Sequence, residues 1–238
     1  MAKTTRLEIL FEDNHLIIVN KKSSDIVQGD KTGDVPLSEK VKEYLKKKYE
    51  KPGNVFVGVI HRLDRPVSGA VAFAKTSKCL ERMNDMFRQH DVQKIYWAVV
   101  KNKPEPVCGT LIHCIKKNEE QNKSYVYEEG VKGALKSELN YRVIGKSERF
   151  FLIEVIPKTG RHHQIRVQLS AIGSPIKGDV KYGYERTNEG GAIHLHSRKM
   201  EFMHPVNKSL VQIIAPLPND VIWNYFENKK LENYSIPL

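Results

Sequence analysis

One stretch constrains this chain more than any other, because it places a single carboxylate on a short connection between two strands. Two apolar runs with strand character, Val55–Ile60 and Ala70–Ala74, flank a polar segment in which Asp64 stands between two arginines. Pro66 lacks a backbone N–H and biases the residue before it away from helix, and Gly69 can adopt backbone angles that other residues resist. We therefore predict that Asp64 is held on a fixed turn.

The amino-acid sequence of this stretch is more specific than that of an ordinary charged turn, in which an Asp would simply pair with an Arg. The string reads His61-Arg62-Leu63-Asp64, then three residues, then Ser68-Gly69 and a strand ending in Ala74-Lys75. It resembles the signature of the RluA-like pseudouridine synthases, which isomerise uridine to pseudouridine in structured RNA. The family usually has Thr where this chain has Val67, so one hydroxyl beside the site is absent.

Further motifs follow in the family's order. A strand with the pattern Lys94-x-Tyr96-x-Ala98 resembles the segment whose tyrosine stacks on the target uracil, although a lone tyrosine in a strand is more often part of a core. The string from Lys158 to Leu169 resembles the family's Thr-Gly-Arg-x-His-Gln-Ile-Arg motif. In that motif the last arginine pairs with the catalytic aspartate, a role that the resemblance gives to Arg166.

Two later segments also match the family. Gly178–Gly183 resembles its Gly-Asp-x-x-Tyr-Gly segment, which we expect to be a structural loop, and His194–Pro205 resembles its Leu-His-Ser…Phe…His-Pro strand. The resemblance therefore implies Asp64, Tyr96 and Arg166 as catalytic residues. We also expect a set of residues to bind RNA: Arg62, Arg65, Lys94, Arg161, His162, His163 and Gln164. A basic helix face near phosphates is the alternative reading of the arginine motif, and it suits Arg161 better than Arg166.

Periodicity alone indicates a mixed, strand-rich chain, and the resemblance implies its fold. That fold is α+β: a long, mostly antiparallel mixed sheet with helices on its flanks and a basic cleft at Asp64. Hairpins are predicted at Leu7–Phe11 with Leu16–Asn20, and at Leu135–Ile144 with Arg149–Ile156. Helices are predicted at Leu37–Tyr49, from Thr76 or Ser77 to His90, at Thr159–Ile172 with His162, His163 and Arg166 on one face, and at Asp220–Phe226.

The chain has 238 residues, which suits one catalytic domain over 1–238 with no room for an added N-terminal RNA-binding module. Lys and Arg number 39 against 28 Asp and Glu, a formal charge of +11 that favours a polyanionic partner or simply a basic surface. Three cysteines, no leader-like start and no membrane-length apolar run predict a cytoplasmic protein. We expect structured RNA, ribosomal or transfer, as its partner, no membrane, and a monomer that requires no protein partner.

No cofactor or metal is expected. The reaction is an isomerisation, and the chain carries neither a dinucleotide fingerprint nor a P-loop. Cys108, His113 and Cys114 fit no standard zinc spacing, and His194 with His196 lacks a third ligand, so hydrogen-bonded structural histidines are the better reading.

Two alternatives remain open at this point. The first is an RNA-binding protein of the same fold that has lost catalysis, which would be expected to lack Asp64, Tyr96 or Arg166. The second is a hydrolase, but glycosidases ordinarily use two carboxylates, and none accompanies Asp64 in these motifs. The carboxylate could attack C1′ or C6 of the nucleoside or take a proton from C2′, and the sequence does not choose among these.

Overall fold

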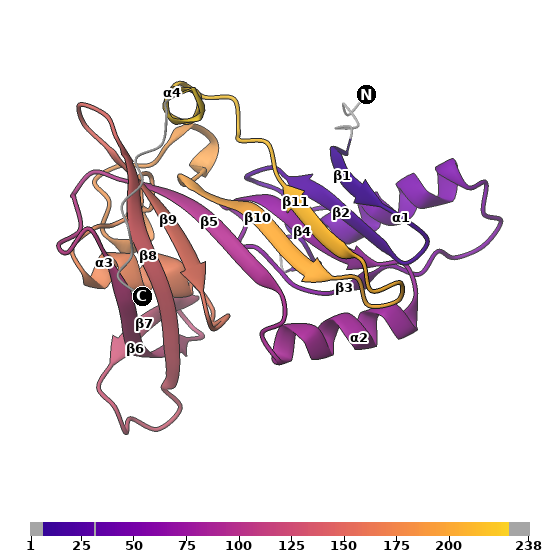
Figure 1. Cartoon of the computed structure of the whole chain (residues 1–238), viewed down its shortest axis with the longest axis horizontal. Coiled ribbons are helices and arrows are strands. Elements are labelled where there is room, and N and C mark those ends of the chain that lie inside the picture. Colours follow the sequence, from indigo (N-terminus) through magenta and orange to yellow (C-terminus); the bar gives the residue numbers. More distant parts are fainter. Residues whose placement is uncertain (1–6, 31, 229–238) are drawn as a thin grey trace. The chain divides into compact units, whose positions relative to one another are not determined.

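The computed structural model describes residues 7–30 and 32–228 and has the predicted α+β class (Figure 1). The described residues form two compact units. The first comprises described residues up to 93 and residues 197–216, and the second comprises residues 94–196 and 217–228. Each unit has its own antiparallel strand pairs and its own buried core. That residues 1–238 act as one catalytic domain stays a prediction.

The first unit opens with the predicted hairpin. Strand β1 (Ile9–Glu12) pairs antiparallel with β2 (Leu16–Lys21), and β2 pairs antiparallel with β4 (Ser68–Ala74). The Asp13 carboxylate closes the turn between β1 and β2 by accepting hydrogen bonds of 2.7 Å from the backbone N–H groups two and three residues later. All seven residues of β4 are buried, so its two faces are both covered.

Two helices cover this part of the sheet. Thr76 or Ser77 was predicted to begin helix α2 (Ser77–Arg88), and Thr76 is the N-cap: its hydroxyl accepts a hydrogen bond from the Cys79 N–H. The apolar side of α2 packs on alternate residues of β2 and β4. Helix α1 (Leu37–Lys48) lies apart from α2, beside β1 and β2, and buries one apolar stripe (Figure 1). Helix α2 and the strands form a core that includes Leu16, Ile18, Ala70, Ala72, Ala74, Cys79, Met83, Met200, Phe202, Val211 and Ile213.

The strand predicted at Val55–Ile60 is mostly absent, and only β3 (Gly58–Val59) forms. The reason lies in β4, which has β2 on one side and β10 (Leu195–Met203) on the other. Only the end of β4, at Phe73 and Ala74, is left for β3 to pair with. Strand β11 (Leu210–Ile214) then pairs antiparallel with β10.

The second unit is built on five antiparallel strands in the order β5-β9-β8-β6-β7. The predicted second hairpin is present as the pairing of β8 with β9. The strands are β5 (Gln93–Val100), β6 (Cys108–Asn118), β7 (Lys123–Tyr127), β8 (Leu135–Lys146) and β9 (Phe151–Pro157). The last described helix, α4 (Val221–Glu227), forms where a helix was predicted. The Asp220 carboxylate caps it, and Trp223 and Phe226 are buried against β5, β8 and β9.

Helix α3 (Gln164–Ala171) begins five residues later than predicted. His163 has a left-handed conformation, with φ of 55°, which a helix cannot continue through. The Gln164 side chain bonds to the preceding turn instead, accepting hydrogen bonds from the Thr159 hydroxyl at 2.8 Å and from the Arg161 N–H at 3.0 Å. His162 and His163 therefore precede the helix, and the prediction that they share a helical face with Arg166 is wrong.

Two single-turn 3-10 segments, η1 (Val180–Tyr182) and η2 (Glu189–Gly191), join α3 to β10. None of the helices formed by residues 7–30 and 32–228 is long and apolar enough to cross a membrane.

Candidate active site

Asp64 lies on a tight turn between β3 and β4, in the first unit. Its carbonyl oxygen accepts a 3.0 Å hydrogen bond from the Val67 N–H, and the residues on either side of the turn, Leu63 and Val67, are buried. Gly69 has φ of +114°, which confirms that this position needs angles other residues resist. Asp64 as a residue is half-buried. The prediction that Asp64 sits on a fixed turn is confirmed.

A buried lysine that the sequence analysis did not single out supports this turn. Lys21 ends β2 and is 1% exposed, and its ammonium group donates to the carbonyl oxygens of Arg65 at 3.0 Å and Val67 at 2.6 Å, both just after Asp64. Burial lowers the pKa of Lys21 to about 7, although the nearby Asp25 and Asp64 carboxylates oppose this shift. The available signal was a lysine on the same strand as the apolar run Leu16–Val19, two residues after it.

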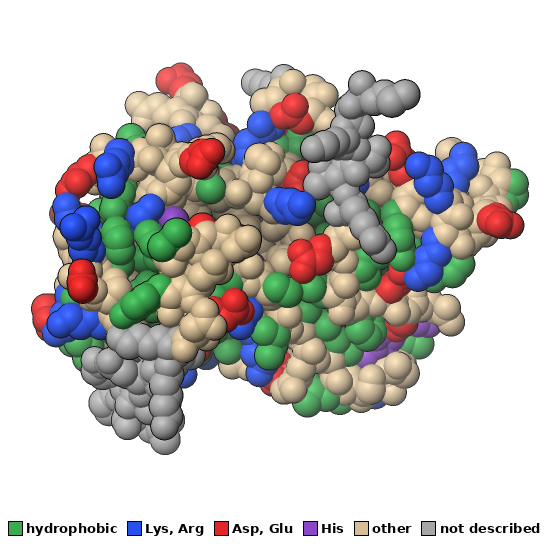
Figure 2. All heavy atoms as spheres, turned by 90° about the horizontal axis from the view of Figure 1, so that it is seen from above, with side chains coloured by type: hydrophobic (Ala, Val, Ile, Leu, Met, Phe, Trp, Pro, Cys, Tyr) green, Lys and Arg blue, Asp and Glu red, His purple; other side chains and the backbone are tan. Residues whose placement is uncertain are grey.

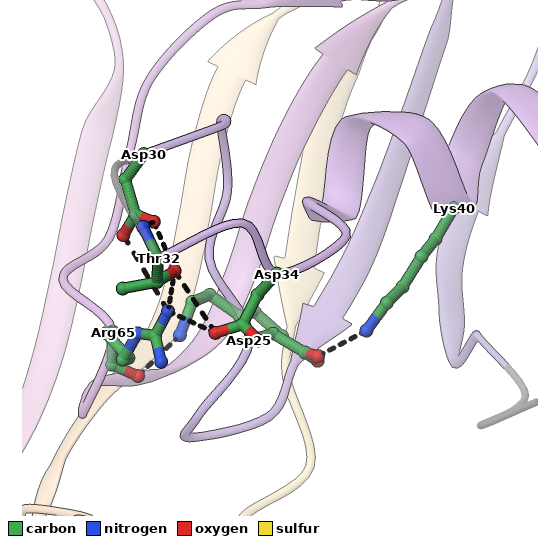
Figure 3. Close-up of polar contacts among 7 residues, drawn as sticks. Asp25, Asp30, Thr32, Asp34, Lys40 and Arg65 are labelled. Carbon is green, nitrogen blue, oxygen red and sulfur yellow. Dashed lines mark hydrogen bonds and ion pairs between the residues drawn. The ribbon is translucent and has the colours of Figure 1, made fainter. Parts of the chain in front are cut away.

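Arg65 points into the loop that follows β2. Its guanidinium donates to the Thr32 hydroxyl at 2.8 Å and to the Asp34 carboxylate at 2.6 Å, and it lies 3.7 Å from Asp30 (Figure 3). A 2.6 Å ion pair between Lys40 and Asp25 fixes another part of the same loop. Arg62 is exposed. RNA contact by Arg62 and Arg65 stays a prediction, and for Arg65 it would require exchange of carboxylate partners for phosphate.

Tyr96 and Lys94 lie on β5, in the second unit. Tyr96 is 9% exposed and stands opposite Val155 of β9, so the strand pairing fixes its backbone. Burial lowers the pKa of Lys94 from its ordinary value. A buried tyrosine and a lysine two residues apart therefore project from the same face of one strand.

Arg166 projects from the first turn of α3 and forms a buried ion pair. Its Nε donates to Oδ2 of Asp179 at 2.7 Å, and its Nη2 donates to Oδ1 of the same carboxylate at 2.8 Å. The Arg166 and Asp179 side chains are 6% and 1% exposed. The sequence predicted a carboxylate partner for Arg166 but named Asp64, and that pairing stays a prediction. A guanidinium has five N–H donors, so the bond to Asp179 is compatible with a second carboxylate.

The remaining residues of the arginine motif build the turn before α3. Arg161 is exposed, whereas Gln164 is buried and donates to the Glu138 carbonyl oxygen at 3.0 Å. The His162 and His163 rings stack with centroids 3.8 Å apart. The Nδ1 atom of His162 shares a 2.8 Å hydrogen bond with the Ser124 hydroxyl. RNA contact by these residues stays a prediction.

His194, just before β10, and His196, on β10, have polar and aromatic partners. The His194 Nε2 atom lies 3.3 Å from the Asp220 carboxylate, and its ring stacks on Trp223. His196 is fully buried and also lies against Trp223. In the described part of the chain, no three His, Cys, Asp or Glu side chains gather as a metal site requires.

Charge is not concentrated on the face drawn in Figure 2, where Lys and Arg side chains stand among Asp and Glu side chains. The basic cleft predicted at Asp64 stays a prediction.

The sequence matches the family described as RNA pseudouridylate synthase over residues 15–171. It is 32% identical to the ribosomal large subunit pseudouridine synthase C of Vibrio cholerae over 225 residues, which cover 91% of this chain and 68% of that protein. It is 33% identical to the protein of the same name from Yersinia pestis, in an alignment that covers 90% of this chain and 66% of that protein. It is 31% identical to tRNA pseudouridine synthase C of Pectobacterium carotovorum, in an alignment that covers 87% of this chain and 58% of that protein.

Two solved structures share the fold. Human RNA pseudouridylate synthase domain containing 4 superimposes with a TM-score of 0.77 at 22% identity, covering 96% of this chain and 95% of that one. Human RNA pseudouridylate synthase domain containing 1 superimposes with a TM-score of 0.70 at 23% identity, covering 92% of this chain and 86% of that one.

Proposed function

This chain belongs to the RNA pseudouridylate synthase family, and we propose that it isomerises uridine to pseudouridine in ribosomal or transfer RNA, with Asp64 as the nucleophile. The turn at Asp64 carries the proposal. The backbone around the half-buried Asp64 is held by one backbone hydrogen bond and by two carbonyl groups bound to Lys21, inside the segment that matches the family. A nucleophile needs such fixed placement.

The reaction exchanges one bond of the nucleoside for another. The bond between N1 of uracil and C1′ of ribose breaks, and C1′ joins C5 of the rotated base. The hydrogen on C5 leaves as a proton and N1 gains one, so no oxidant or reductant is required. An ionised Asp64 can assist by attack at C1′ or C6 or by removing a proton from C2′. In each case the rate depends on the charge of the carboxylate and on its orientation toward the reacting atom.

Arg166 and Tyr96 complete the proposed site. A guanidinium favours the ionised form of a carboxylate and fixes its orientation through planar hydrogen bonds. The target base must leave the RNA stack, which costs a few kcal/mol. Stacking on the Tyr96 ring returns roughly 1–3 kcal/mol of that cost. The proposal thus requires that Asp64 of the first unit meets Arg166 and Tyr96 of the second in the RNA-bound enzyme.

The expected RNA contacts are Arg62, Arg65, Lys94, Arg161, His162, His163 and Gln164. Phosphate contacts give affinity and register without reading sequence. The named relatives support ribosomal or transfer RNA as the substrate class. We include in the proposal that the enzyme works as a monomer and that it works in the cytoplasm. Three free cysteines support the cytoplasmic location alone, because thiols persist in a reducing compartment.

Release of the C5 hydrogen provides the test. Ribosomal and transfer RNA are labelled with [5-³H]uridine in a strain lacking the gene, and the purified protein is added. We expect tritium to appear in water while the RNA keeps its length and loses no base. Cleavage or release of free uracil would instead identify a hydrolase, and binding without tritium release would identify an RNA-binding protein that has lost catalysis.

A further inference from the structure

The ion pair between Arg166 and Asp179 is too well enclosed to be an incidental contact. Both side chains are almost fully buried, and the two hydrogen bonds are parallel, at 2.7 and 2.8 Å. A buried pair of this kind adds little net stability, because removing two charges from water offsets their attraction. What it does provide is geometry, since two parallel bonds fix the plane of the guanidinium.

Asp179 is itself held rigidly. Its N–H donates to the Ile176 carbonyl oxygen, and its own carbonyl oxygen accepts from the N–H groups of Tyr182 and Tyr184, at 3.0 and 3.1 Å. The preceding Gly178 has φ of +88°, and a Cβ there would lie 2.2 Å from the Asn188 amide nitrogen. The carboxylate therefore sits on a turn whose shape is fixed on both sides.

Tyr182 encloses the guanidinium on another side. Its ring centroid lies 5.0 Å from Cζ of Arg166, within range of a cation–π interaction. The ring is positioned in turn by its hydroxyl oxygen, which accepts from the Ser124 N–H at 2.8 Å and shares a 2.8 Å hydrogen bond with Nδ1 of His163. The Gly-Asp-x-x-Tyr-Gly segment thus supplies both groups that orient Arg166.

We propose that Asp179 is a positioning residue for catalysis, which with Tyr182 fixes the plane of Arg166 so that its remaining donors aim at the catalytic carboxylate. This inference rests on the proposed function of Asp64 and Arg166. Asp179 accepts from Nε and Nη2, so the direction of the Nη1 group is set by the same plane. A guanidinium that could rotate would lose this aim, and a misplacement of about 1 Å can cost about 100-fold in rate.

The test replaces Asp179 in two ways and measures the single-turnover rate at saturating enzyme, RNA affinity and thermal stability. Asp179→Asn removes the charge, and Asp179→Glu keeps it but moves the carboxylate by one methylene. We expect Asp179→Asn to be slower by about 100-fold, the cost of a misplaced group, with RNA affinity near that of the wild type. Asp179→Glu should fold and show an intermediate loss. Glu154→Gln, which breaks the half-buried Arg142–Glu154 pair of the same unit, is the matched control and should keep its rate.

A double variant separates positioning from general structural damage. If Asp179 acts through Arg166, Asp179→Asn combined with Arg166→Lys will be no slower than Arg166→Lys alone. Additive losses, a normal rate for folded Asp179 variants, or a rate that falls only with the folded fraction would each overturn the proposal.

Failure of this inference is distinguishable from failure of the proposed function. If the wild-type protein releases no tritium from labelled RNA, the proposed function fails. The pairing then has its own measurement, the Nε–H nuclear magnetic resonance signal of Arg166, assigned by its loss in Arg166→Lys. We expect slow exchange of that proton with water in the wild type and fast exchange in Asp179→Asn. Equal exchange in the two proteins would contradict the fixed geometry.

Discussion

A carboxylate that acts as a nucleophile has to be ionised and aimed, and each requirement falls on particular residues of this chain. Lys21 and the Val67 N–H hold the backbone around Asp64. In the proposed site, Arg166 aims the carboxylate, and Asp179 in turn aims Arg166. Supporting residues of this kind are buried, whereas Arg161 of the same motif is exposed. Burial thus distinguishes the two arginines that the motif places five residues apart.

Replacing each arginine by lysine tests that distinction. Arg166→Lys keeps the charge but loses the planar fork, so we expect the single-turnover rate to fall by about 100-fold with little change in RNA affinity. Arg161→Lys should be mild, and Arg161→Ala should weaken binding and reduce the salt slope by about one. Equal rate losses at the two positions would show that the catalytic role belongs to neither arginine alone.

The buried Lys21 makes a prediction about pH. Its pKa is about 7 in the folded protein, against 10.5 for an ordinary lysine, so between these values the unfolded chain binds more protons than the native one. Stability contributed by Lys21 therefore rises with pH across that window, by about 2 kcal/mol from pH 7 to pH 9. Urea denaturation at both pH values should show this rise in the wild type and not in Lys21→Met. Parallel pH profiles for the two proteins would mean that Lys21 remains charged in the fold.

At the level of elements, the helices and hairpins that were predicted correctly are those with a clear local sequence signal. The first hairpin, α1, α2 with its Thr76 cap, the β8–β9 hairpin and α4 all follow from periodicity and capping residues. The two predictions that were wrong, the length of β3 and the start of α3, concern features that tertiary contacts and side-chain hydrogen bonds decide. Strand β3 is short because β10 occupies most of the edge of β4, and α3 starts late because the Gln164 side chain stabilises a non-helical turn.

The same limit applies to the candidate site. The motifs named Asp64, Tyr96 and Arg166, but no local signal could show that the Asp179 segment lies against α3. Nor could it show that the ammonium group of Lys21 lies beneath the Asp64 turn. The contacts join residues that are 13 and 46 positions apart, beyond the spacing of neighbours within one helix or strand, and they depend on how the strands and helices pack.

The close approach of β4 to β10 is tested at Gly69. A Cβ at this position would lie 2.4 Å from the Ser197 carbonyl oxygen, and φ of +114° is unfavourable for any other residue. We expect Gly69→Ala to lower the free energy of unfolding by at least about 2 kcal/mol. Gly53→Ala in the same unit, where a Cβ meets nothing within 4 Å, should change it by less than about 1 kcal/mol. Similar denaturation midpoints for the two variants would contradict the close approach.

At the scale of the whole molecule, the charge of +11 bears on RNA affinity. If phosphate contacts dominate binding, log K will fall linearly with log[salt], and four neutralised phosphates already give a slope of about −3. Filter binding of the labelled RNA between low and moderate salt measures this slope. A flat response would contradict an RNA substrate held by basic residues.

The role of Asp64 in the isomerisation is tested by replacing its carboxylate with an amide. Asp64→Asn keeps the shape of the side chain and removes its charge, and tritium release from [5-³H]uridine-labelled RNA reports turnover. Asp85→Asn, an exposed carboxylate of α2 that pairs with Arg88, serves as the control. We predict that Asp64→Asn binds the RNA but releases no tritium above background, while Asp85→Asn matches the wild type. Robust tritium release by Asp64→Asn would show that Asp64 is not the nucleophile.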